Sequence, residues 1–481
     1  MTHFSRRAAG PLACLLLVAA PLVARQNAPD RSRPPEPGPM PALTIPPIQK
    51  HVLSNGLPVW IVEMDEVPVV NLTVIVKSGG AADPVDRAGL AHYTAAMLDE
   101  GAGTHDALSL SDAIDFLGAS LVTTTTFDAS IVRLHSLVST FDEALPLLAD
   151  VVLRPTFPEA DMERLRNERL TLLLQVRDNV SQLASAAFSR LLFGDDHRYG
   201  WPLMGTEATN RAITPADVRD FYTTHYRPTH AHLLAVGNVS AAVLLPKLEQ
   251  AFGGWDTGAA PATAFPDAPR PASRQIYLVD RPGAAQSEIR VGTVGVARST
   301  PDYFILDVLN TILGGSFTSR LNQNLREEHG YSYGAGSGFA MRAWPGPFVA
   351  QAAVQTDRTA ESLIEFFREL DGMTTPIPAD ELIKARSLQA LSFPGSFETT
   401  RQMAGQLSEL VIHALPESFF EQYVPRIQAV TAPDLERAAR QYLQTDRMIV
   451  VIAGDVASIE QSIRAASLGP VTVVAADDVL N

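Results

Sequence analysis

Two short segments of the sequence carry residue types that could do chemistry. The first is PVDRAGLAHYTAAMLD (84–99), which is predicted to form a helix and holds one histidine, His92. Ala95 and Ala96 follow at spacings of three and four, on the same face of that helix. A catalytic zinc ion needs about three protein ligands, and this face offers one. From its residues alone, the segment predicts a packed or solvated histidine.

The second segment is LGGSFTSRLNQNLREEHGYSYGAGSGF (313–339). A glycine pair leads into a predicted helix from Thr318 to Glu328, with its leucines on the buried side, and Gly330 ends that helix. Arg326 and Tyr333 lie seven residues apart, and both can donate hydrogen bonds to a carbonyl oxygen that becomes an oxyanion. On its own, the pattern favours a surface ion pair of Arg326 with a nearby glutamate, and a packing role for Tyr333. No Gly-Lys-Ser/Thr follows the glycines, so the segment is not a phosphate loop.

Helices are predicted to position these residues. Asp83 can cap the helix that holds His92, and Pro84 suits its first turn. Further helical patterns cover 158–178 and 357–373. The helix at 158–178 carries Glu168 and Gln175, which on their own would be a charged residue and an amide on a surface.

Two further histidines, His230 and His232, alternate on a predicted strand, so both should face the same side. They could in principle chelate a metal ion. No third ligand accompanies them, and the pattern favours an exposed strand face.

The chain is organised as two similar halves. Residues 214–238 and 431–455 each begin with a helix start of threonine, proline and aspartate, continue as an amphipathic helix, and end in an apolar strand and a glycine. Matching residues are offset by 217, namely Thr214 and Thr431, Asp217 and Asp434, Gly237 and Gly454. A repeat this long indicates a duplicated domain and not a solenoid.

Within each half, predicted strands come first, helices follow, and another strand closes the half. The predicted fold class is α+β, with two homologous domains that each cover a mixed β-sheet with helices. A proline-rich linker at 257–274 divides the N-terminal domain (47–256) from the C-terminal domain (275–481).

The composition limits the classes of function. The chain has 481 residues, of which 46% are apolar and 19% are charged, as in folded globular proteins. Its net charge of -15 argues against binding to nucleic acid or to an anionic membrane surface. The single cysteine, Cys14, excludes an intramolecular disulfide, CxxC redox chemistry and cysteine-based zinc sites.

Residues 1–24 have the pattern of a secretory signal peptide. Arg6 and Arg7 precede an apolar stretch that ends in small residues at Ala24. The stretch is shorter than the ~20 residues of a membrane helix, so we expect an exported, periplasmic protein with no integral membrane span. A lipoprotein anchor at Cys14 fits less well, because most of the apolar stretch follows it. Residues 25–46 are predicted to form a proline-rich tether.

Across both halves, the sequence resembles the pitrilysin/insulinase family of zinc metallopeptidases, the inverzincins. The resemblance rests on short matches along the chain: Asn55-Gly56-Leu57, Gly89-Leu90-Ala91-His92, Pro155-Thr156-Phe157, Tyr226-Arg227-Pro228, Val236-Gly237-Asn238, Ser319-Arg320-Leu321 and Leu325-Arg326-Glu327.

In active members of that family, the motif H-x-x-E-H supplies two zinc-binding histidines and a general-base glutamate, and a glutamate on a second helix completes the zinc site. The resemblance puts Ala95 at the base position, Ala96 at the second histidine and Gln175 at the second-helix glutamate. One histidine and one amide cannot hold catalytic zinc, and alanine cannot accept a proton. We therefore expect no metal or other cofactor in this chain, and no peptidase activity from the chain alone.

The resemblance also implies that an arginine and a tyrosine of the second domain complete the active site, and Arg326 and Tyr333 match that pair. Tyr331 matches less well, since it lies five residues from Arg326. The implied function is that of the non-zinc subunit of a heterodimeric peptidase, whose homologous partner carries H-x-x-E-H and the zinc ion. The two domains would form half of a clam-shell chamber for peptides or unfolded protein segments. The alternative is a catalytically inactive scaffold or peptide-binding subunit.

Overall fold

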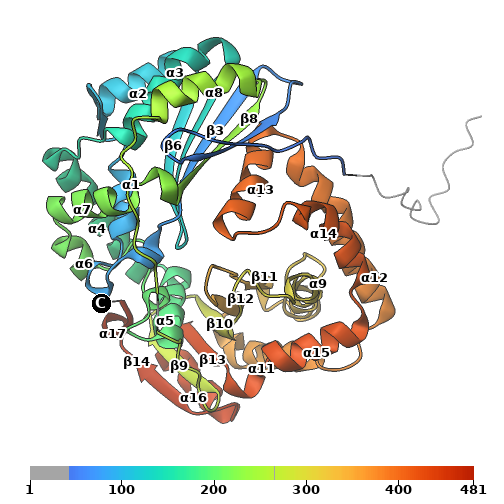
Figure 1. The fold of residues 1–481 in the computed structure, drawn as a ribbon. Helices are drawn as coiled ribbons and strands as arrows, with labels where there is room; N and C mark the ends of the chain where they lie inside the picture. Colours follow the sequence, from blue (N-terminus) through green and yellow to red (C-terminus); the bar gives the residue numbers. More distant parts are fainter. Residues whose placement is uncertain (1–42, 265, 481) are drawn as a thin grey trace, which may run out of the picture. The chain divides into compact units, whose positions relative to one another are not determined.

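The computed structural model describes residues 43–264 and 266–480, and its strands form two six-stranded sheets (Figure 1) and one short two-stranded sheet of β4 (Gly101–Ala102) and β5 (His105–Asp106). The predicted signal peptide at 1–24 and residues 25–42 of the predicted tether lie outside the described residues. In both halves of the described chain strands come first, a run of helices follows, and a further strand returns to the sheet, as predicted for the α+β fold class.

The first sheet is mixed. Its strands, in spatial order, are β1 (Gln49–Val52), β2 (Pro58–Glu63), β8 (Ala231–Gly237), β3 (Val69–Val76), β7 (Ser130–Leu137) and β6 (Ser120–Thr125). Only β2 and β8 run parallel to each other, and all other neighbours are antiparallel.

The second sheet repeats this plan. Its strands, in spatial order, are β11 (Ser332–Phe339), β12 (Pro347–Gln355), β10 (Gln286–Val294), β13 (Ile449–Gly454), β9 (Gln275–Asp280) and β14 (Val471–Val474). The strands β9, β13, β10, β12 and β11 have the order and the directions of β2, β8, β3, β7 and β6. The two sheets differ at one edge, where β1 is antiparallel to its neighbour and β14 is parallel. This shared topology confirms the predicted duplication.

The equivalent helix starts are also alike. Thr214 caps α7 and Thr431 caps α15, and each forms a reciprocal capping box with the aspartate three residues later.

Helices from the same half of the chain pack on one face of each sheet, and further helices of that half pack on these. The first half contributes α1 (Leu90–Ala96), α2 (Ala107–Phe116), α3 (Phe141–Leu153), α4 (Glu159–Asp178), α6 (Glu207–Ala212), α7 (Pro215–His225) and α8 (Ala241–Phe252). The second half contributes α9 (Tyr303–Leu313), α11 (Thr359–Gly372), α12 (Ala379–Ser392), α14 (Ser418–Ala429), α15 (Ala432–Tyr442) and α16 (Val456–Ala465). The short helices α10 (Arg320–Asn322) and α17 (Ala476–Leu480) complete the set within the described residues.

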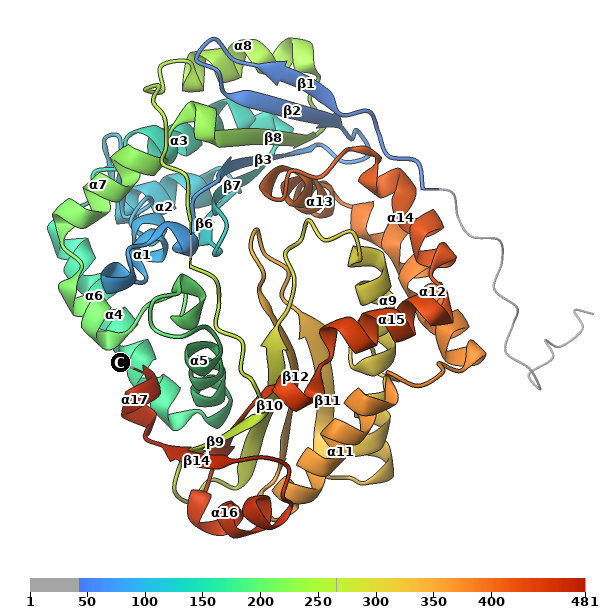
Figure 2. The same ribbon diagram turned by 60° about the horizontal axis from the view of Figure 1, so that its bottom comes forward.

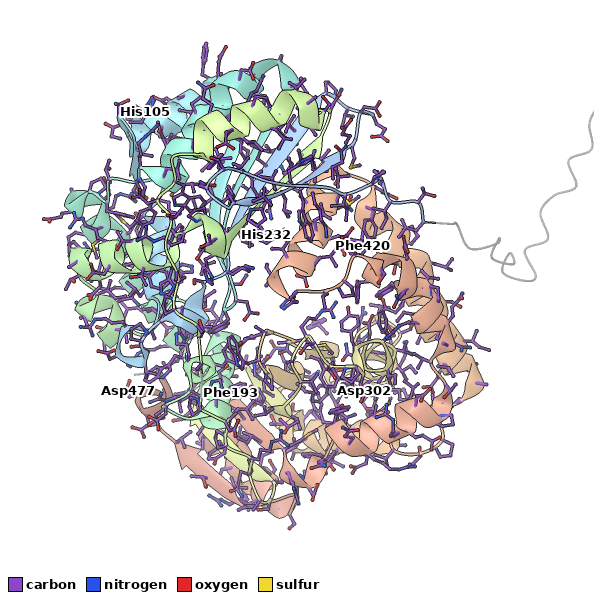
Figure 3. The ribbon with its side chains drawn as sticks, viewed as in Figure 1. His105, Phe193, His232, Asp302, Phe420 and Asp477 are labelled. Carbon is purple, nitrogen blue, oxygen red and sulfur yellow. The ribbon has the colours of Figure 1, made fainter. Side chains whose placement is uncertain are left out.

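The other face of each sheet is covered by a helix from the opposite half. Helix α5 (Val180–Phe193) belongs to the first half but packs on β10 and β13 of the second sheet. Helix α13 (Thr400–Ile412) belongs to the second half but packs on β3 and β8 of the first sheet. Figures 1 and 2 show both helices against these strands, and Figure 3 labels Phe193 at the end of α5.

This exchange explains the pattern of buried residues. The side chains of Leu183, Ala187 and Phe188 on α5 form one apolar cluster with Val451 on β13. Val450 and Ile452, which flank Val451 on β13, point to the opposite face of the sheet and pack among the helices of the second half. The two halves therefore interlock and share their cores.

Within residues 43–264 and 266–480, none of the helices has both the length and the apolar character needed to cross a membrane.

The helix exchange predicts that the two halves unfold together. Leu407 is fully buried on α13, so Leu407→Ala should cost about 2–5 kcal/mol of the free energy of unfolding. Because α13 covers the first sheet while belonging to the second half, a single cooperative transition in urea should move to lower concentration. The matched control, Leu388→Ala on the exposed side of α12, should change stability by less than about 0.5 kcal/mol. A curve with two transitions, of which only one moves, would contradict the interlocked fold.

Candidate functional site

Helix α1 positions His92, and it begins later than the sequence predicts. The prediction starts the helix at Pro84, whereas residues Val85–Arg87 form a 3₁₀ turn and α1 begins at Leu90. The residue before the helix, Gly89, has a φ of 95°, and a Cβ there would lie 2.3 Å from the carbonyl oxygen of Met204. Only glycine fits this close approach, and it resets the start of the helix.

Asp83, the predicted capping residue, does bind the start of α1, although it precedes the first helical residue, Leu90, by several residues. Its carboxylate accepts hydrogen bonds from the amides of Gly89 (2.8 Å) and Ala91 (2.7 Å). It also forms an ion pair with Arg198 at 2.8 Å, in which both side chains are buried. Burial raises the pKa of Asp83, whereas Arg198 and the two amides act in the opposite direction. The pair fixes α1 to the loop that precedes α6.

The residue of α4 that meets His92 is Arg169. Its Nη1 lies 2.6 Å from Nδ1 of His92, and the arginine side chain is almost fully buried. Since a guanidinium only donates, Nδ1 of His92 must accept. Burial, and then the charge of Arg169, lower the pKa of His92 to about 4. The histidine is therefore neutral at pH 7 and oriented by an arginine.

The remaining donors of Arg169 also have partners. Nε donates to Oδ1 of Asn210 at 2.7 Å, and Nη2 donates to the carbonyl oxygens of Met204 (2.8 Å) and Gly89 (3.2 Å). The guanidinium carbon lies 4.6 Å from the centre of the Tyr93 ring, where a cation–π interaction is favourable. Burial lowers the pKa of Arg169 to about 10, so it stays charged at pH 7.

The placement of Gln175 as the second-helix ligand is wrong for this structure. Gln175 is exposed and lies six residues after Arg169, which turns it about 240° away around the helix. Glu168 is also exposed and pairs with Arg164 at 2.9 Å. The face of α4 that contacts α1 holds Met162 and Arg169, seven residues apart. No local pattern in the sequence singles out these two residues.

The residues around His92 do not fit zinc. Among the residues that the structure describes, no three histidine, cysteine, aspartate or glutamate side chains are grouped to hold a metal ion. Ala95 is buried on α1, where a base would be needed to take a proton from water. The group in contact with His92 is itself a cation.

Arg326 and Tyr333 lie in the second half, around a short turn of helix. The predicted helix from Thr318 starts at Arg320, runs as α10 to Asn322 and then widens into a π-helical turn, Gln323–Glu328. Single π turns in helices often occur at functional sites. The guanidinium of Arg326 lies over the Phe317 ring at 4.6 Å and 3.6 Å from the Glu327 carboxylate.

The side chain of Tyr333 is 93% exposed, at the start of the edge strand β11. Tyr331, by contrast, is half-buried and stacks on His329 with 4.9 Å between the ring centres. Of the two tyrosines, Tyr331 packs within the chain and Tyr333 extends away from it.

A pocket of about 550 Å³ lies beside these residues. Its walls are the loop 314–317, the β11 residues 334–336, and parts of β10, β12 and α5. Glu288 of β10 lines it, and burial raises the pKa of that carboxyl group. Phe317, which contacts Arg326, forms part of the same wall. The structure thus brings Arg326 and Tyr333 to one segment next to a pocket, and their described contacts do not include His92.

His230 and His232 do not share a strand face as predicted. His230 ends a 3₁₀ turn (Pro228–His230), where its Nε2 donates to the carbonyl oxygen of Lys77 at 2.8 Å and lies 3.0 Å from Oγ of Ser78. His232, labelled in Figure 3, is on β8 with its ring edge against Trp60. The hydroxyl of Ser78 in turn lies 2.9 Å from Nδ1 of the buried His225.

Two protein-family models match the chain. The model described as Insulinase (Peptidase family M16) matches residues 59–206, and the model described as Peptidase M16 inactive domain matches residues 212–388.

Relatives and solved structures agree with these matches. An uncharacterized zinc protease of Streptomyces coelicolor is 26% identical over 404 residues, which cover 82% of this chain and 87% of that protein. The crystal structure of a peptidase M16 inactive domain from Pseudomonas fluorescens has a TM-score of 0.79 at 27% identity, over 85% of this chain and 98% of that one. A protease from Helicobacter pylori has a TM-score of 0.78 at 20% identity, over 85% and 100%.

The buried ion pair at the start of α1 should be expensive to break. Asp83→Asn keeps one of the two oxygens that accept the amide hydrogens of Gly89 and Ala91 and leaves Arg198 charged and unpaired, so we expect a loss of about 3 kcal/mol or more. The control is Asp86→Asn, three residues away, whose pair with Arg87 is exposed; it should change stability by less than about 0.5 kcal/mol. Urea unfolding followed by circular dichroism measures both, and equal losses in the two variants would contradict the role given to Asp83.

Buried neutral histidines should make the protein sensitive to mild acid. Burial, and then the nearby His230, lower the pKa of His225 from 6.5 to about 4. Between pH 4 and pH 6.5 the unfolded chain binds more protons than the folded chain. The free energy of unfolding therefore has its full value above pH 6.5 and falls as the pH drops towards 4. The maximum loss from His225 is on the order of 3 kcal/mol.

The measurement is the free energy of unfolding at pH values from 4 to 7, compared between the native protein and His225→Gln. The variant cannot take up the proton, so its stability should depend less steeply on pH in this range. Identical slopes would show that His225 does not titrate on unfolding.

Proposed function

Because this chain belongs to the insulinase family, peptidase family M16, we propose that it is the non-zinc subunit of a heterodimeric metallopeptidase. In this proposal Arg326 and Tyr333 complete the active site of a homologous partner, which carries H-x-x-E-H and the zinc ion. The substrates are peptides or unfolded protein segments.

The observation that carries the proposal is the exposure of Tyr333. Its side chain is 93% exposed, although burying a large aromatic side chain would normally be favourable. A phenol in this position contributes little to the stability of the chain that holds it. It is available to a second molecule, which the partner's active site and its substrate would supply.

The chemistry of the two side chains suits peptide hydrolysis. The phenol can donate a hydrogen bond to the scissile carbonyl as negative charge develops on its oxygen. The planar guanidinium of Arg326 can donate in parallel or hold the substrate backbone. The Phe317 ring and the Glu327 carboxylate leave part of the guanidinium open, because the Arg326 side chain is 36% exposed.

An extended peptide would bind as an added strand. Strand β11 is an edge of the second sheet, and its amides at Ala335 and Ser337 already donate to Oδ1 of Asn322 and to the carbonyl oxygen of Gly314, so a peptide would pair with the part of the edge nearest Tyr333. A peptide added there would lie with its main chain next to Tyr333, at the beginning of the strand. Main-chain hydrogen bonds give affinity with little sequence selectivity. The neighbouring pocket would then receive side chains of the peptide.

The zinc ion has to come from outside the described chain in this proposal, because the residues around His92 do not fit it. The partner would be a related subunit, and the two chains together would enclose the clam-shell chamber. We further propose an exported, periplasmic location, on the basis of the signal-peptide pattern at 1–24.

The second candidate is a scaffold or peptide-binding subunit with no catalytic contribution. The observation in its favour is the state of the first half, where His92 is held by an arginine and cannot act in metal chemistry. The two candidates make opposite predictions for Tyr333 and Arg326 in the assembled complex.

The test is co-expression with a relative that has an intact H-x-x-E-H, such as one encoded by a neighbouring gene, followed by a fluorogenic peptide assay on the purified complex. Tyr333→Phe and Arg326→Ala should each lower kcat by about 10²–10³, as the loss of an oxyanion donor does elsewhere. The matched control is Arg447→Ala, on an exposed turn of the same half, which should leave kcat unchanged.

Size-exclusion chromatography separates loss of catalysis from loss of assembly. Complexes that assemble normally and keep full activity in both variants would rule out a shared active site and support the scaffold.

A further inference from the structure

Arg169 is a buried cation with no anion in contact. Its side chain is only 4% exposed, and among the described residues it forms no ion pair. The nearby carboxylate of Asp83 is already paired with Arg198. Burying an unpaired charge is costly unless neutral oxygens and nitrogens surround it. Four such contacts and one aromatic face surround this guanidinium.

These contacts come from separate parts of the chain. Gly89 and His92 belong to the start of α1, Met204 to the loop before α6, and Asn210 to α6 itself. Arg169 projects from α4 between them. Neutral oxygen and nitrogen atoms from several segments thus direct their lone pairs at one positive centre. A bound metal ion usually creates the same arrangement.

We propose that Arg169 is an internal cation that takes the place of a metal ion in the first half, and that it excludes zinc from this site. His92 then has a definite role, since its Nδ1 is one of the acceptors that hold the guanidinium. The exclusion is both steric and electrostatic. The guanidinium already occupies the lone pair of Nδ1 at 2.6 Å, and a divalent ion would have to sit beside a fixed positive charge.

This inference separates two causes for the lack of zinc. Ala95→Glu/Ala96→His offers zinc two histidines on α1, and adding Arg169→Ala removes the guanidinium without adding a ligand. If the missing ligands alone were responsible, these two variants should bind zinc equally weakly. If Arg169 excludes the ion, the variant without the guanidinium should bind zinc more tightly. Arg169→Glu in place of Arg169→Ala adds a third ligand and should strengthen binding further.

The experiment titrates three full-length variants with zinc against a zinc-binding dye. We expect no more binding than in the wild type for Ala95→Glu/Ala96→His, and binding tighter by about tenfold or more when Arg169→Ala is added, because a fixed positive charge has been removed. With Arg169→Glu in place of Arg169→Ala we expect about one tightly bound zinc per chain. Equal zinc affinities with Arg169 and with Arg169→Ala would overturn the proposal.

A second measurement does not depend on building a new site. Arg169→Ala should leave a polar cavity, and free guanidinium ion at millimolar concentration should raise the melting temperature of this variant relative to an equal concentration of sodium ion. The control is Arg164→Ala, on the exposed side of the same helix, which guanidinium should not stabilise. If guanidinium affects both variants alike, Arg169 does not act as a bound cation.

Discussion

Each sheet of this protein has two apolar faces, and each half of the chain supplies helices for one of them. On β3, every residue after the first is buried, and on β13 all six residues are buried. Strands of this kind are stable only with cover on both sides. The exchange of α5 and α13 supplies the missing cover, because each helix packs on the sheet of the opposite half. The pocket beside Arg326 and Tyr333 depends on this interlocking, because Ser181 of α5 forms part of its wall.

The parts of the fold that depend on local patterns could be predicted from the sequence. The duplication was visible in the paired helix starts at Thr214 and Thr431, because a capping box needs only residues three apart. The long helices at α4 and α11 begin within two residues of their predicted starts. The helix exchange could not be predicted in this way. An amphipathic pattern shows that one face of a helix is buried, but it does not show against which sheet.

The site around His92 could also be predicted only in part, because local patterns do not report contacts between distant residues. The loss of the zinc motif could be read from Ala95 and Ala96, since it concerns residue identity alone. The contact of Arg169 with His92 joins residues 77 positions apart, and no local pattern reports it. Arginine is rarely buried, so the sequence favoured a surface position. The start of α1 was also missed, because it depends on how closely Gly89 approaches Met204.

The two sites differ in how their polar groups are satisfied. Around His92, the guanidinium of Arg169 donates hydrogen bonds to the histidine, to the side-chain oxygen of Asn210 and to two carbonyl oxygens. These acceptors are therefore already used within the chain and not open to a ligand. The π-helical turn in the second half is anchored instead by Asn324, whose amide donates to the carboxylates of Glu365 and Glu369. That anchor faces the core, whereas Arg326 and Tyr333 project from the same segment towards solvent. Polar groups held in place but not satisfied by their own chain are suited to act on another molecule. Of the two sites, the one in the second half is therefore the one whose polar groups remain open to another molecule.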